Sequence, residues 1–147
     1  MRIALGQLES GTDIKANLAA IDRFATAAAL DGASLVAFPE YATYEKKKVD
    51  ATFPEVAEPL DGPVCRELAN TARRHRIALV AGVVETADEP GKAYNTLVAF
   101  GPDGARLAFY RKIHLFDARA SGNRRSSSRV RPLIRWCLSP GEPGLGS

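Results

Sequence analysis

The chain has 147 residues, of which 46% are apolar and 25% charged, enough for one domain with a buried core. The net charge of +3 is uneven, because residues 1–117 carry 14 basic and 16 acidic side chains whereas residues 118–147 carry six arginines and one glutamate. A nucleic-acid-binding fold would carry its basic excess on the folded part, so this distribution argues against that class.

The cysteine content and the hydropathy predict a cytoplasmic protein. Cys65 and Cys137 are too few for the disulfide framework of a small secreted domain. The apolar run at residues 3–8 is too short for a signal peptide and lacks a small-residue cleavage pattern. No stretch approaches the roughly 18 apolar residues that span a bilayer, so we expect no membrane partner.

A strand, a helix and a second strand are predicted at the start of the chain. The apolar run at residues 3–8 predicts a buried strand. Thr12 or Asp13 can then cap a helix that ends at Asp31-Gly32, where glycine accepts the left-handed backbone of a C-terminal cap. Residues 35–38 form the next strand, and so short a βαβ unit predicts that its two strands are parallel.

A second helix and three further strands are predicted after a polar segment. Residues 41–59 are irregular, with a charged run typical of a solvated loop or a short surface helix. Asp61 or Gly62 caps the second helix, which has proline in its first turn and arginines at its end. The strands that follow are expected at residues 77–84, 94–100 and 107–110. The pattern predicts an α/β fold with a mixed sheet and helices on one face.

Two charged residues directly follow predicted strands. Glu40 lies at the carboxyl end of the strand at residues 35–38, where open α/β sheets collect their active sites. Partial desolvation there would raise the pKa of a glutamate toward the range of a general base. Lys112 precedes an apolar run and can present a fixed positive charge to an oxyanion. Each residue alone also fits a plain surface charge, and His114 fits a partly buried structural residue better than a base.

Five short segments occur along the chain in one order: Ile3-Ala4-Leu5-Gly6-Gln7-Leu8, Phe38-Pro39-Glu40, Tyr94-Asn95-Thr96, Gly101-Pro102-Asp103-Gly104 and Tyr110-Arg111-Lys112-Ile113-His114-Leu115-Phe116-Asp117. Together they resemble the nitrilase superfamily, the carbon–nitrogen hydrolases. The resemblance covers residues 1–117. The run around Lys112 is most similar to the omega-amidase and deaminated-glutathione amidase branch.

This resemblance implies both a fold and a reaction. The fold is an α-β-β-α sandwich, of which residues 1–117 supply the N-terminal portion. The reaction is hydrolysis of a non-peptide amide of a small carboxylate metabolite by a Glu-Lys-Cys site, with Glu40 as general base and Lys112 stabilising the tetrahedral intermediate. No organic cofactor and no metal is implied. A small-molecule amide is the expected partner, and a complete chain is expected to form a homo-oligomer.

The nucleophilic cysteine of such a site is not recognisable. In the family it follows the lysine segment at a strand-to-helix elbow. Cys137 has no convincing strand before it and a Pro/Gly-rich end after it, so no elbow is expected there. Cys65 lies on the second predicted helix and is most simply a small core residue. The chain is therefore expected to be inactive as it stands.

The last 30 residues differ from the rest in composition, because 19 of them are Arg, Ser, Gly or Pro and none is lysine. We therefore divide the chain into an incomplete carbon–nitrogen hydrolase domain at residues 1–117 and a basic tail at residues 118–147 that is unstructured or translated out of frame. Besides an amidase, the chain could be an inactive truncated fragment that associates with other subunits. Nucleic-acid binding by the tail is disfavoured, because Trp136 is its single aromatic residue.

Overall fold

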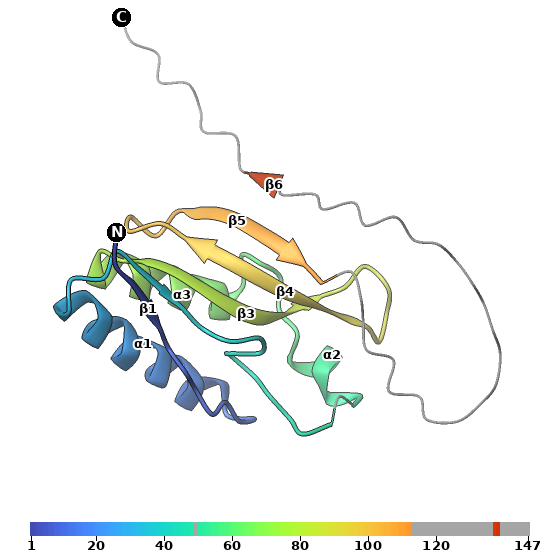
Figure 1. Ribbon diagram of the computed structural model, residues 1–147. Helices are drawn as coiled ribbons and strands as arrows, with labels where there is room; N and C mark the ends of the chain where they lie inside the picture. The colour runs from blue at the N-terminus through green and yellow to red at the C-terminus, as the bar shows by residue number, and fades with distance from the viewer. Residues whose placement is uncertain (49, 113–136, 139–147) are drawn as a thin grey trace, which may run out of the picture.

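The computed structural model describes residues 1–48 and 50–112, and residues 137–138 by their backbone. These residues form one sheet whose strands are ordered as they occur in the chain (Figure 1). The strands are β1 Ile3–Leu5, β2 Leu35–Ala37, β3 Ala78–Thr86, β4 Ala93–Phe100, β5 Arg106–Arg111 and β6 Cys137–Leu138. Strands β1 to β3 are parallel and the later neighbours are antiparallel, so the sheet is mixed, as predicted.

Two long helices, α1 Ile14–Leu30 and α3 Pro63–His75, cover the same face of the sheet (Figure 1). Helix α1 begins where predicted, because Oδ1 of Asp13 accepts a hydrogen bond of 3.1 Å from the amide of Ala16. Oε2 of Glu58 accepts from the amide of Val64 at 2.8 Å and so caps α3 from outside the helix. The core lies between these helices and the sheet, and its fully buried side chains include Ile21, Leu68, Ile77, Leu79, Val36 and Val98.

The other face of the sheet, which we call the open face, is apolar over much of its area. Ala4 packs against the helix-side core, so its strand neighbours Ile3 and Leu5 point to the open face, where their exposed fractions are 51% and 82%. Leu97 on β4 is 38% exposed and lies on the same face. The described residues thus form one helix layer and one sheet, which is the α/β half of the predicted sandwich.

Two elements were not expected from the sequence. A five-residue helix, α2 Thr52–Val56, interrupts the predicted irregular segment, where Phe53 is buried between Tyr41 and Tyr44. In the segment expected to be unstructured, Cys137–Leu138 pairs with β5 opposite Phe109 and Ala108. Strand β5 would otherwise be an edge, whose free backbone groups can pair with any extended segment.

The rest of the predicted tail, residues 118–136 and 139–147, and His114 lie outside the described residues. None of the helices in the described part of the chain is both long and apolar enough to cross a bilayer.

Candidate active site

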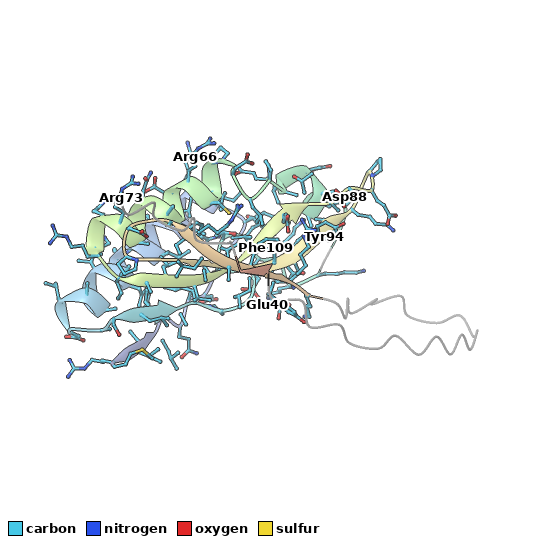
Figure 2. All side chains as sticks on the ribbon, turned by 90° about the horizontal axis from the view of Figure 1, so that it is seen from above. Glu40, Arg66, Arg73, Asp88, Tyr94 and Phe109 are labelled. Carbon is cyan, nitrogen blue, oxygen red and sulfur yellow. The ribbon has the colours of Figure 1, made fainter. Side chains whose placement is uncertain are left out.

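Glu40 lies in a tight corner that follows β2. The chain continues past the end of β2 along β3, with the amide of Phe38 donating to the carbonyl of Val80 at 2.8 Å. It then turns at Tyr41, whose φ of 57° is in the left-handed region that residues other than glycine seldom adopt. A non-glycine residue held in this conformation often marks a functional site, because the surrounding structure must stabilise it. The corner directs Glu40 to the open face of the sheet, opposite helix α3 (Figure 2).

The corner lies directly on the backbone of β3 at Gly82. The amide of Gly82 donates to the carbonyl of Pro39 at 3.3 Å. A Cβ at this position would lie 2.6 Å from the nitrogen of Tyr41 and 2.9 Å from the Cα of Glu40, both backbone atoms that have no rotamer through which to move. Only glycine therefore allows β3 to pass beneath the corner, and Gly82 fixes where the Glu40 carboxylate stands.

Lys112 reaches the same place from the other end of the described chain. It follows β5 directly, and its amide donates to the carbonyl of Asn95 on β4 at 2.8 Å. Its ammonium group donates to Oε1 of Glu40 at 2.6 Å, although 72 positions separate the two residues. The structure thus brings together the two residues that the sequence selected separately.

Asn95 joins the two charged residues through its side chain and its backbone. Its amide Nδ2 donates to Oε1 of Glu40 at 2.5 Å, while its carbonyl holds the backbone of Lys112. Asn95 is buried, with an exposed fraction of 7%. Both donors bind Oε1, and among the described residues no donor binds Oε2 of Glu40.

The electrostatics of Glu40 differ from the sequence-based expectation. Its side chain is 52% exposed. The hydrogen bond from Lys112 lowers the pKa of Glu40, burial raises it by a smaller amount, and the hydrogen bond from Asn95 lowers it further, so that the pKa lies below its ordinary value. The expected rise in pKa by desolvation is therefore wrong for this structure. The contact with Glu40 raises the pKa of Lys112 in turn, so the pair is a carboxylate and an ammonium at neutral pH.

A pocket of about 280 Å³ opens beside this pair on the open face. Leu97 and Tyr110 give it an apolar wall opposite the charged groups. Its lining residues are Glu40, Gly82, Asn95, Leu97, Tyr110 and Lys112. A small molecule bound here would meet a cation, a carboxylate and an amide at one end and hydrocarbon along its side.

The thiol of Cys65 lies away from this pocket. Cys65 is 4% exposed in the core under α3, and burial raises the pKa of its thiol to about 11. Such a thiol carries almost no thiolate at neutral pH and is inert, which agrees with its interpretation as a core residue. Cys137 is described only through its backbone pairing with Phe109. In the described ranges no three His, Cys, Asp or Glu side chains are grouped so as to hold a metal ion.

Sequence reasoning assigned no role to Asn95 or Gly82. A single glycine inside the apolar strand pattern at residues 77–84 is a known signal of close backbone approach, so Gly82 could have been found. Asn95 occurs in one of the segments that carry the family resemblance, but its spacing from Glu40 gives no hint of a contact. Only the pairing of β3 with β4 brings it beside the corner.

We expect the substitution Lys112→Met to raise the pKa of Glu40 toward its ordinary value, because the main stabilisation of the carboxylate is lost. In the wild type this stabilisation is present above the pKa of the unfolded chain and disappears as pH falls through the lower pKa of the folded state. Since both side chains are substantially exposed, it contributes less than about 1 kcal/mol. A ¹³C NMR titration of the Glu40 carboxyl measures the shift. Lys46→Met, which removes an ion pair with Asp50 instead, should leave the Glu40 titration unchanged.

We expect Gly82→Ala to lower the free energy of unfolding by about 1–3 kcal/mol, because the added methyl group pushes the Glu40 corner away from β3. The matched control is Gly11→Ala, where nothing lies within 4 Å of the added atom and the change should stay within about 0.5 kcal/mol. Denaturant unfolding of both variants measures the difference. Equal stability of the two variants would show that the corner does not depend on Gly82.

Comparison with known proteins places these features in a family. The Carbon-nitrogen hydrolase family model matches residues 2–144, which includes the described sheet and continues past Asp117. A hydrolase of Mycobacterium tuberculosis is 42% identical over 120 residues, which are 80% of this chain and 41% of that protein. The human omega-amidase NIT2 is 39% identical over 121 residues, 82% of this chain and 43% of that protein. The chain therefore spans less than half the length of these relatives.

Solved structures agree with the sequence relatives. An amidase from Nesterenkonia sp. superposes with a TM-score of 0.69 at 29% sequence identity, over 79% of this chain and 44% of that one. The omega-amidase NIT2 of Danio rerio matches a longer stretch, 37% identical over 141 residues, 96% of this chain and 48% of that protein. The match of the family model to nearly the whole chain, together with the nitrilase-type fold, shows that this chain belongs to the carbon–nitrogen hydrolases of the nitrilase superfamily.

Proposed function

We propose that Glu40 and Lys112 are the general base and the oxyanion-stabilising residue of a Glu-Lys-Cys amidase site that hydrolyses a non-peptide amide of a small carboxylate metabolite. The observation that carries this proposal is the 2.6 Å contact between the two side chains in a pocket on the open face. A plain surface charge would not require a partner from a distant strand. Here Gly82, Asn95 and the turn at Tyr41 all help to hold Glu40 against Lys112.

In the proposed reaction Glu40 moves protons. It takes the proton of a cysteine thiol, and the thiolate attacks the amide carbon. It returns that proton to the departing amine, so that ammonia leaves and a thioester remains. It then takes a proton from the water that hydrolyses the thioester. Oε2, which has no donor among the described residues, is the oxygen suited to this exchange.

Lys112 would compensate the negative charge on the carbonyl oxygen in both tetrahedral intermediates. Its hydrogen bond is also the largest cause of the lowered pKa of Glu40. When Lys112 donates to a substrate oxygen instead, that cause weakens and Glu40 becomes a stronger base. Binding of the substrate to Lys112 would therefore raise the pKa of Glu40 and make it a stronger base.

The nucleophile would be a cysteine other than Cys65, because the Cys65 thiol is buried in the core. One structure of a mutant of the Nesterenkonia amidase shows covalent addition of the acetamide moiety of fluoroacetamide at the active site cysteine of that enzyme. That amidase is similar to this chain in fold and sequence, which supports the same chemistry here. A complete protein of this type is proposed to be a cytoplasmic homo-oligomer.

The substrate class rests on two observations. Several relatives are omega-amidases, and the pocket offers an apolar wall beside the charged pair, suited to a short carbon chain. In the described part of the lining the only cation is Lys112, which is engaged with Glu40, so a substrate carboxylate would be held by residues outside that part.

Ammonia release from succinamate, the monoamide of a short dicarboxylic acid, tests the proposal, with butyramide as the uncharged comparison. If the chain turns over, Glu40→Gln and Lys112→Ala should each lower the rate about 10²–10³-fold, because each removes a group that acts on the reacting atoms. Cys65→Ser should retain the rate. Activity that survives Glu40→Gln would overturn the roles proposed here. No ammonia from the wild type would identify the chain as an inactive fragment.

The division of the chain near Ala118 remains a prediction. Sequencing of the encoding DNA from the codon of Leu115 to well past Ser147 tests it. We expect a single-base slip near Ala118, with another reading frame that continues into strands and a cysteine elbow. A confirmed reading frame without such a continuation would mean that the cell makes a chain that ends in the basic tail.

A further inference from the structure

The carboxylates of Glu40 and Glu85 bind neighbouring residues of β4 and β5 on opposite faces of the sheet. Thr96 and Arg111 are cross-strand partners, and successive residues of a strand point to opposite faces. On the open face the next residues, Asn95 and Lys112, donate to Glu40. On the helix face Thr96 and Arg111 donate to Glu85 of β3.

The contacts of Glu85 satisfy both of its oxygens. Its residue is 4% exposed, and Arg111 binds it with two parallel hydrogen bonds, Nε to Oε2 at 2.9 Å and Nη2 to Oε1 at 2.6 Å. The hydroxyl of Thr96 donates to Oε2 at 2.6 Å. The guanidinium also lies 4.4 Å from the ring centre of Tyr94. The hydroxyl of Tyr94 donates to Asp88, and both residues are labelled in Figure 2. The bidentate contact with the buried Glu85 carboxylate and the cation–π contact with Tyr94 together hold Arg111 in one orientation.

This pair is a poor device for stability alone. Burying the Glu85 carboxylate carries a large desolvation cost, and the Arg111 side chain is 43% exposed, so water screens part of the attraction that offsets this cost. The bidentate hydrogen bond adds geometric specificity, because the planar guanidinium of Arg111 can bind both oxygens of Glu85 in only one arrangement of β3 and β5.

Lys112 must be held in a defined position for its side chain to reach Glu40. It comes directly after the last residue of β5, where strand ends fray, and its long side chain loses much rotational freedom when it is fixed. Its backbone has one described ladder bond, to Asn95. An anchor on the adjacent residue prevents the end of β5 from separating from β4.

We propose that Glu85 and Arg111 form a positioning pair that holds the end of β5 on the helix face, so that Lys112 reaches Glu40 on the open face. The proposal rests on the role of Lys112 proposed above. Neither member of the pair touches the pocket or the reacting atoms, and both act through the backbone between Arg111 and Lys112.

The titration of Glu40 in the full chain tests this proposal without any need for turnover. Arg111→Lys keeps the positive charge and removes the fork. We expect the pKa of Glu40 to move more than half of the way from its wild-type value to its value in Lys112→Met. Arg74→Lys is the matched control, because it changes an arginine that pairs with Asp22 on the helix layer, and it should not move the titration.

A second variant keeps the test decisive if Arg111→Lys does not fold. Thr96→Val removes one hydrogen bond to Glu85 at similar volume and with both charges kept, and it should move the Glu40 pKa in the same direction by a smaller amount. An unchanged Glu40 titration in every folded variant would overturn the positioning role. The expected titrations in a chain whose wild type releases no ammonia would support the positioning pair and count against the proposed amidase function alone.

Discussion

The close approach of the Glu40 corner to β3 is the constraint on which the candidate site depends. Because residue 82 is glycine, the backbone of Pro39, Glu40 and Tyr41 can lie directly against the strand. This contact brings a carboxylate from the end of β2 over to the start of β4 and the end of β5, which are two and three strands away in the sheet order. Without it, Glu40 would stand at the end of its own strand, beyond the reach of Lys112.

The two faces of the sheet have different roles, because one holds the strands together and the other carries the candidate site. On the helix side, Glu85 is buried and fully paired, and its contacts hold strands together. On the open side, Glu40 is half exposed, and two donors bind its Oε1 while its Oε2 has no donor among the described residues. Two glutamates with similar partners thus have different chemistry, because one lies under the helix layer and the other faces a pocket.

Much of the fold follows from local pattern. The capping of α1 by Asp13, the parallel start of the sheet and the antiparallel strands after α3 were predicted from periodicity, caps and turn residues, which act within a few positions of the chain. Helix α2 was missed because its stability comes from the burial of Phe53 between two tyrosines rather than from its own sequence. The pairing of Cys137–Leu138 was missed because it depends on the free edge of β5.

For the site, the sequence by itself determined which residues carry charge at strand ends, and its resemblance to a family selected Glu40 and Lys112 among them. Only the tertiary structure decided that they touch, that Asn95 joins them and that the pKa of Glu40 falls rather than rises. The physical reason is distance along the chain. A pKa depends on which charges stand within a few ångströms, and here those charges come from strands that only the folding of the sheet brings together.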